Sequence, residues 1–197
     1  YRCTNACRHC LYRCSPSKPD EWMDIGMAER VFDALKTERR LSGIHLAGGE
    51  ATLRFNLLCD IVRLAVDKGI PLDYLETNAA WCQDRTETAE KLTALREAGL
   101  PAVLVSASMF HNEFVPFEHT RNCVEAGLEV FGRTGVIVWL PNLYEILSQL
   151  PDPEKRRSLK DFCKQTGLAP DSPRIPELYH VIPGGRAPEA LRPCYTP

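Results

Sequence analysis

With 197 residues, 44% of them hydrophobic, the chain can bury one core, and two full domains are not expected. The net charge of −2 and the lack of any basic run longer than residues 155–157 argue against binding to nucleic acid or to an anionic membrane. No apolar run approaches the about 20 residues of a membrane helix, and no signal-like stretch is present, so the sequence predicts a cytoplasmic protein.

Helical periodicity alternates with short apolar runs along most of the chain. The first predicted helix has an apolar face of four residues, Met27, Val31, Ala34 and Leu35. A capping box of Asp84 and Glu87 begins a later helix, which is predicted to end at Gly99. Further helices are predicted at residues 57–65, 116–126 and 152–167.

Five apolar runs between these helices are typical of buried parallel strands, at residues 44–47, 72–77, 102–107, 136–140 and 179–182. Strands that alternate with helices indicate the α/β class. A closed eight-unit barrel usually needs about 250 residues, so a partial (β/α)6 TIM-like barrel fits the length better. Its first strand would precede Cys3, and the chain is therefore expected to be a fragment.

Nine cysteines are present, and three of them, Cys3, Cys7 and Cys10, fall within eight positions. An odd number at this density argues against a disulfide scaffold and favours reduced thiolates that bind a metal. Three thiolates on a short arc can converge on an iron-sulfur cube and leave one iron without a protein ligand. A zinc site completed by His9 or Cys14, or ordinary buried thiols, are the alternatives.

The spacing Cys-x3-Cys-x2-Cys, with His9 directly before the last cysteine, resembles the signature of the radical S-adenosylmethionine (radical SAM) enzymes. In that family three cysteines bind a 4Fe-4S cluster, and the open iron takes the amino and carboxylate groups of S-adenosylmethionine. The resemblance implies that Cys3, Cys7 and Cys10 are the cluster ligands and that His9 contacts the cofactor.

A second motif, Gly48-Gly49-Glu50, follows the predicted strand at 44–47. Two glycines let the backbone approach a ligand closely, and Glu50 offers an acceptor to a cationic amine. The motif is similar to the family's GGE turn, which receives the methionyl amino group. Glycine pairs after strands are also common in plain turns, so the two motifs together carry the resemblance.

Small polar side chains end the next two predicted strands, Thr77 and Asn78 on one and Ser106 on the other. In α/β barrels the chemistry sits at the carboxyl ends of the strands. The resemblance implies that such residues hold the ribose and the methionyl carboxylate of the cosubstrate. Turn formation or helix capping is the alternative for each of them.

The remaining cysteines and histidines receive no catalytic assignment. Cys59, Cys123 and Cys163 fall in helical patterns, where small buried hydrophobes are expected. Cys14 and Cys82 are left without a role. His111 and His119 follow a strand in a loop, where a histidine is most often simply solvated.

Two domains of unequal size follow from the resemblance: residues 1–182 as the radical SAM core, and residues 183–197 as the start of a C-terminal extension. In many family members such an extension is rich in cysteine and carries auxiliary clusters. Cys194 would be the one cysteine of that kind here, and a surface thiol is the alternative.

The resemblance implies an enzyme whose reduced cluster cleaves S-adenosylmethionine to methionine and a 5′-deoxyadenosyl radical, which abstracts hydrogen from a substrate. An electron donor such as flavodoxin or ferredoxin is implied with it. The substrate is a small molecule or a peptide, and the expected extension favours a peptide or protein side chain. A noncatalytic electron-transfer or zinc-binding module is the rival function, and a plain βα scaffold is another.

Overall fold

A four-stranded parallel sheet organises the computed structural model, which describes residues 1–195. The strands are β1 (Ile44–Leu46), β2 (Leu72–Thr77), β3 (Val103–Ser106) and β4 (Val136–Trp139), hydrogen-bonded in the order β1-β2-β3-β4. Leu75 of β2 lies beside Leu46 on one side and Val103 on the other. The α/β class is confirmed, and the open sheet is consistent with part of a TIM-like barrel.

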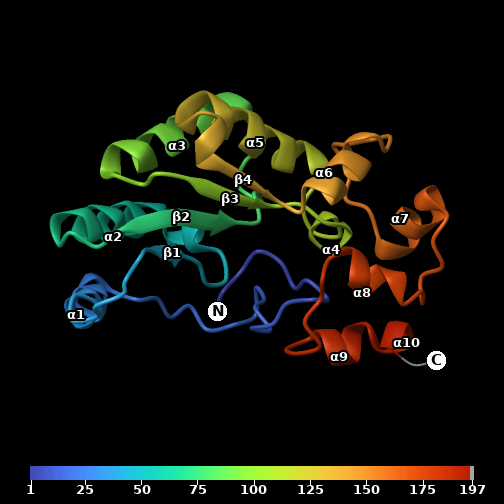
Figure 1. The fold of residues 1–197 in the computed structure, drawn as a ribbon. Coiled ribbons are helices and arrows are strands. Elements are labelled where there is room, and N and C mark those ends of the chain that lie inside the picture. The colour runs from blue at the N-terminus through green and yellow to red at the C-terminus, as the bar shows by residue number, and fades with distance from the viewer. Residues whose placement is uncertain (196–197) are drawn as a thin grey trace.

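Helices occupy the connections between the strands, and further helices follow β4. They are α1 (Ile25–Leu35), η1 (Ala51–Arg54), α2 (Phe55–Asp67), α3 (Arg85–Ala98), α4 (Met109–Asn112), α5 (Phe117–Phe131), η2 (Arg133–Gly135), α6 (Pro141–Ser148), α7 (Leu159–Thr166), α8 (Arg174–Leu178), α9 (Ala187–Ala190) and α10 (Arg192–Tyr195). Figure 1 shows α3 and α5 on one side of the sheet, with the N-terminal loop and α8 to α10 on the other. Within the described residues, no helix is both long and apolar enough to span a membrane.

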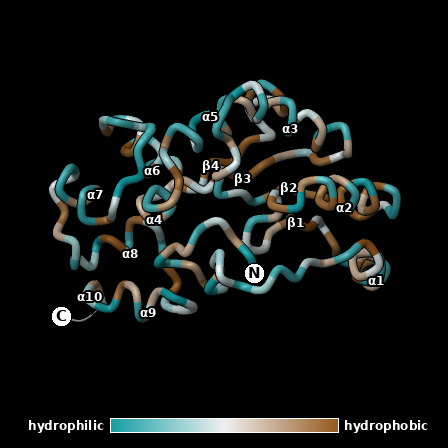
Figure 2. The backbone as a smooth tube through the Cα atoms, turned by 180° about the vertical axis from the view of Figure 1, so that it is seen from behind, coloured by the Kyte–Doolittle hydropathy of each residue, from teal (hydrophilic) through white to brown (hydrophobic). Residues whose placement is uncertain are grey.

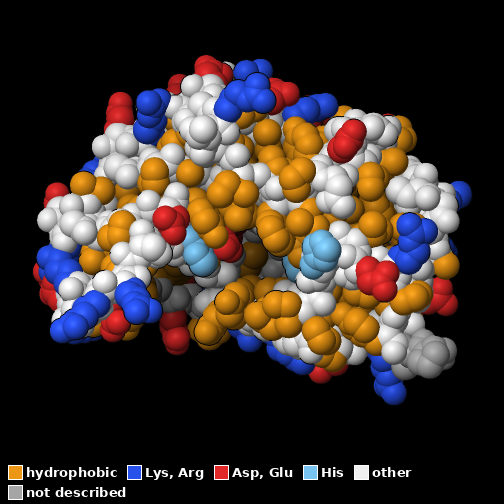
Figure 3. All heavy atoms as spheres, viewed as in Figure 1, with side chains coloured by type: hydrophobic (Ala, Val, Ile, Leu, Met, Phe, Trp, Pro, Cys, Tyr) orange, Lys and Arg blue, Asp and Glu red, His pale blue; other side chains and the backbone are white. Residues whose placement is uncertain are grey.

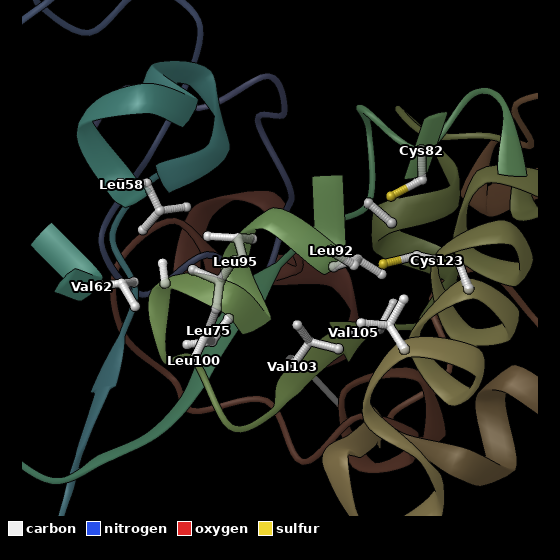
Figure 4. Packing of buried hydrophobic residues seen from close by; sticks show 14 of the residues in the cluster. Leu58, Val62, Leu75, Cys82, Leu92, Leu95, Leu100, Val103, Val105 and Cys123 are labelled. Atoms are coloured by element: carbon white, nitrogen blue, oxygen red, sulfur yellow. The ribbon is translucent and has the colours of Figure 1, made fainter. Parts of the chain in front are cut away.

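The main core lies between the sheet and helices α2, α3 and α5. Leu92 and Leu95 of α3 are fully buried against Leu75 and Val103 of the strands, as Figure 4 shows. Burying each such side chain contributes about 1.5–3 kcal/mol. Cys82 and Cys123 are buried in the same cluster, and the predicted buried state of Cys123 is confirmed, as it is for Cys59 and Cys163.

Helix α3 has the ends that its sequence predicts. The Asp84 carboxylate accepts the backbone N–H of Glu87 at 2.9 Å, and Gly99 ends the helix with a φ of 112°. A side chain at this φ would be strained, so glycine is the favoured residue. The helix predicted from residue 152 begins later, because Ser158 caps α7 by accepting the N–H of Asp161.

The face predicted for α1 is wrong at Met27, Val31 and Ala34, whereas its fourth residue, Leu35, does pack against the buried cluster. Ala28 and Phe32 are buried against α2, whereas Met27 and Val31 are exposed. Both pairs have the four-residue spacing of a helix, so periodicity alone does not choose between them. The position of α2 decides which stripe is covered.

The strand predicted at residues 179–182 is also wrong. The segment leaves α8 in a turn, in which the N–H of Val181 donates to the carbonyl of Pro176 at 2.9 Å. That local bond uses a donor that a sheet would need. Tyr179 instead packs its ring against His9 and Phe110, with centroid distances of 4.4 and 5.8 Å.

A second hydrophobic cluster joins the two ends of the chain. Cys7 from the N-terminal loop packs in it with Phe110 after β3 and with Ala187, Leu191 and Cys194 near the C-terminus. Figure 2 shows hydrophobic, brown stretches of the tube in α8 to α10, on the side of the sheet where the N-terminal loop lies. The described part of residues 183–197 is therefore packed on the sheet domain through this cluster.

Candidate active site

One cavity of about 380 Å³ gathers every residue that the sequence singles out as a ligand. Its lining includes all ten: Cys3, Cys7, His9, Cys10, Gly48, Gly49, Glu50, Thr77, Asn78 and Ser106. They come from the N-terminal loop and from the carboxyl ends of β1, β2 and β3, where a parallel sheet brings its strand ends together. Figure 3 shows this face hollowed between the sheet and the C-terminal segment, with hydrophobic and histidine side chains around the hollow.

Contacts from distant segments fix the loop that carries the three cysteines. The N–H of Cys3 donates to the carbonyl of Ser15 at 3.2 Å, which closes the loop at its base. At its far side, Arg8 forms a two-pronged ion pair with Glu113, with N–O distances of 2.9 and 3.1 Å. A bidentate pair of this kind fixes geometry as well as charge.

Cys3 and Cys7 are buried and Cys10 is half-buried, and two of the three thiols receive hydrogen bonds from N–H groups. Cys3 Sγ accepts the backbone N–H of Asn5 at 3.4 Å and the side-chain amide of Asn78 at 3.3 Å. Cys10 Sγ accepts the N–H of Cys14 at 3.3 Å. Such donors stabilise negative charge on sulfur, the form that binds iron.

Burial raises the pKa of the Cys7 thiol, and the neighbouring Cys3 and Cys10 raise it further by charge repulsion. Burial likewise raises the pKa of Cys3. Three thiolates crowded in this way need a strong positive charge nearby, which a metal centre supplies. Among the described residues, no three His, Cys, Asp or Glu side chains converge closely enough to share a single metal ion.

Glu50 is a buried carboxylate at the cavity wall, only 2% exposed. It accepts hydrogen bonds from the hydroxyls of Thr52 (2.6 Å) and Thr77 (2.9 Å) and from the N–H of Asn78 (2.8 Å). Burial outweighs these donors and raises its pKa. No basic side chain in residues 1–195 forms an ion pair with it. A cationic ligand would therefore complete its environment.

The glycine turn before Glu50 is required by a close backbone approach. A Cβ on Gly49 would lie 1.7 Å from the carbonyl oxygen of Arg2, which accepts the N–H of Glu50 at 2.9 Å. Gly48 has a φ of 152°, and a Cβ there would meet nothing within 4 Å. Gly49 thus lets the turn dock on the cysteine loop, and Gly48 leaves cavity space open.

Two buried polar atoms lack any partner in the described part of the chain, Asn5 Nδ2 and His9 Nδ1. Both residues line the cavity beside the cysteines. Buried donors and acceptors normally find partners, so these two orphans indicate a missing ligand. Together with the thiols and the unpaired Glu50, they fit an iron-sulfur cluster with a cationic molecule beside it.

The other predicted polar residues divide between support and lining. Thr77 and Asn78 hold the Glu50 carboxylate, and Asn78 also donates to Thr4 at 2.9 Å. Ser106 lines the cavity. His119 lies away from the cavity lining, and its ring Nδ1 is 3.3 Å from the carbonyl oxygen of Ala80.

Sequence reasoning missed several lining residues. His111, expected to be solvated, is buried and lines the cavity with Cys14, Trp139 and Tyr179. No motif marks His111 or Tyr179. For Tyr179, the turn after α8 that places the side chain was expected to be a strand. Trp139 lies one residue before the end of the strand predicted at 136–140, and that position was the available signal.

A parallel α/β sheet with a three-cysteine loop and an acidic turn at its strand ends is typical of enzyme domains of the TIM-barrel type. The model of the radical SAM superfamily matches residues 1–144, so the chain belongs to that superfamily. Its members generally bind a 4Fe-4S cluster and S-adenosylmethionine and perform radical chemistry. None of the curated proteins compared with the chain matches it significantly.

Proposed function

We propose that Cys3, Cys7 and Cys10 bind a 4Fe-4S cluster and that Glu50 binds the amino group of S-adenosylmethionine beside it. The observation that carries this proposal is the single cavity shared by the three thiols and an unpaired, buried carboxylate. When bound, the cluster and cosubstrate supply a 5′-deoxyadenosyl radical that abstracts hydrogen from a substrate. Further contacts to the cosubstrate are assigned to six lining residues: His9, Gly48, Gly49, Thr77, Asn78 and Ser106.

The chain's own residues orient and shield this chemistry. Two hydroxyls and one backbone N–H fix both oxygens of Glu50, so the carboxylate faces the cavity in one orientation. Its burial excludes water, which strengthens the attraction to an ammonium group. The hydrogen bonds to the sulfur atoms of Cys3 and Cys10 favour ionised thiols at the same wall.

His111 lines the cavity and offers it a neutral hydrogen-bond donor. The Oγ of Ser108 accepts the backbone N–H of His111 at 3.3 Å and lies 2.8 Å from His111 Nδ1. We assign the hydroxyl proton to that contact, because Ser108 is buried and this arrangement satisfies both groups. Nε2 then carries the ring proton, and burial lowers the pKa of His111 to about 4.

The substrate we propose is a peptide or protein side chain. Four hydrophobic residues line the cavity and are also exposed at its mouth: Leu11, Tyr12, Trp139 and Ile182. Apolar surface gathered around a cavity is typical of sites that bind another molecule. The neutral donor of His111 suits a peptide carbonyl. Cys194 does not add to this proposal, because its thiol is buried against the carbonyl of Pro170.

We further propose that residues 1–182 form the catalytic core and residues 183–197 a C-terminal segment, and that flavodoxin or ferredoxin supplies the electron. The test of the function is anaerobic reconstitution with iron and sulfide, followed by dithionite and S-adenosylmethionine. We expect 5′-deoxyadenosine and methionine in equal amounts from the native chain, and none from Cys7→Ala. A reconstituted native chain that releases neither product would overturn the proposal.

A further inference from the structure

Arg186, which lies in the turn directly before α9, reaches back to the cysteine loop. Its Nη1 donates to the carbonyl of Cys7 at 2.6 Å and its Nη2 to the carbonyl of Cys14 at 2.7 Å. Its backbone N–H donates to the carbonyl of Cys10 at 3.0 Å. One residue thus holds three carbonyls on the loop that carries the proposed cluster ligands.

Apart from the ion pair of Arg8 with Glu113, local turns hold this part of the loop. Residues 7–14 form turns, with bonds from the N–H of Cys10 to Cys7 and from the N–H of Arg13 to Cys10. Neither bond belongs to a helix or to a β-sheet. The carbonyls of Cys7 and Cys10 keep these turn bonds without Arg186, whereas the carbonyl of Cys14 has no other hydrogen bond among the described residues. The guanidinium therefore satisfies the Cys14 carbonyl and ties it to that of Cys7, which adds stability to the loop.

Gly185 shows how closely the two segments approach. Its φ is 57°, and a Cβ there would lie 2.2 Å from the carbonyl oxygen of Leu11 and 2.4 Å from that of Cys10. Only glycine fits at this distance. A separate, two-pronged ion pair between Arg13 and Glu189 joins the same segments, but both side chains are exposed, so water and salt screen it.

The guanidinium of Arg186 also brings a positive charge to the backbone of Cys7, one of the three proposed cluster ligands. A guanidinium bound to the carbonyl of a cluster ligand stabilises the state with more negative charge, which for an iron-sulfur cluster is the reduced one.

We propose that Arg186 is a positioning residue that orders the cysteine loop before metal arrives and raises the reduction potential of the bound cluster. The second part rests on the proposed function, whereas the first does not. The site then depends on both ends of the chain, and residue 186 lies beyond the segment 1–144 that matches the family model.

The test compares the full chain with Arg186→Met, Arg186→Lys and the control Glu189→Gln, which breaks the exposed pair between the same segments. Hydrogen exchange of residues 3–15 is measured in the metal-free chains by mass spectrometry. Two further measurements are made after anaerobic reconstitution. They are the amount of iron that each chain retains and the midpoint potential of its cluster, from a titration monitored by EPR.

We expect exchange to be about tenfold faster in Arg186→Met, because a charged donor of two hydrogen bonds is lost. This variant should retain less iron, and its remaining cluster should have a more negative potential. Arg186→Lys should exchange faster than the native loop but keep a potential near the native one. Glu189→Gln should match the native chain in all three measurements.

Native exchange and iron retention in Arg186→Met would overturn the ordering role, and a native potential would overturn the electrostatic one. If the methionine variant loses its native circular dichroism, the lysine variant decides, and native exchange there would refute the ordering role. A native chain that binds no cluster, while its loop protection still depends on Arg186, would refute the proposed function and leave the ordering role standing.

Discussion

Glu50→Gln isolates the charge of the carboxylate with almost no change in volume. The native side chain accepts three hydrogen bonds and has no cationic partner in residues 1–195. The proposed partner is the ammonium group of S-adenosylmethionine. The substitution removes that charge-assisted contact and leaves the cavity shape unchanged.

The size of the effect follows from the burial of the carboxylate. A hydrogen bond to a charged group contributes about 1.5–3 kcal/mol, which corresponds to a roughly ten- to hundredfold weaker affinity. A second cost falls on the free chain. In the native chain the hydroxyls of Thr52 and Thr77 and the N–H of Asn78 all donate to the carboxylate. The NH₂ group of a glutamine must face one of these two sides, where a donor then meets a donor.

The assay is anaerobic calorimetric titration of S-adenosylmethionine into the reconstituted protein. Glu76→Gln is the matched control, because Glu76 lines the same cavity but is half-exposed and pairs with His45 at 3.3 Å. We expect a roughly ten- to hundredfold loss for Glu50→Gln and less than about threefold for the control. Equal affinities of Glu50→Gln and the native chain would refute the assigned role of this carboxylate.

Three further predictions concern metal uptake, pH and packing. Cys7→Ala should abolish cluster uptake, whereas Cys14→Ser should retain it, as measured by iron content and absorbance; loss in both would indicate a fourth protein ligand. The pKa of His111 falls from 6.5 to about 4 on folding, so its neutral form contributes stability above pH 6.5 that is lost as pH falls toward 4. Urea titrations measure the drop in the free energy of unfolding between pH 6.5 and pH 4. His111→Gln should make this drop about 3 kcal/mol smaller, and His180→Gln, at an exposed position, should leave it unchanged. An unchanged drop in His111→Gln would contradict the burial of His111. Leu92→Ala should lower the free energy of unfolding by about 2–5 kcal/mol, and a cost below about 1 kcal/mol would show that α3 is not packed as described.

The parts of the fold that local sequence encodes were predicted well. Strand β2 has the predicted bounds, because an apolar run lies between a Gly-Pro stop and a capping box. The wrong face of α1 and the absent strand at 179–182 depend on neighbours that periodicity does not show. The position of α2 decides which face of α1 is buried. The turn bond from the N–H of Val181 to the carbonyl of Pro176 keeps residues 179–182 out of the sheet.

The candidate site shows the same division. Motif spacing placed the cysteines and Glu50 in one cavity, because short loops after parallel strands meet at one edge. Arg186 and Tyr179 could not be predicted in this way. Arg186 contacts the cysteine loop and Tyr179 lines the cavity, each through contacts across more than 160 residues of chain, and no spacing rule links them to the cysteines.

The most direct test of the central claim is the EPR spectrum of the reduced, reconstituted chain before and after S-adenosylmethionine is added. An iron atom without a side-chain ligand should bind the sulfonium compound and change the signal of the cluster. An identical spectrum, or a native preparation that holds zinc in place of iron and sulfide, would contradict the account.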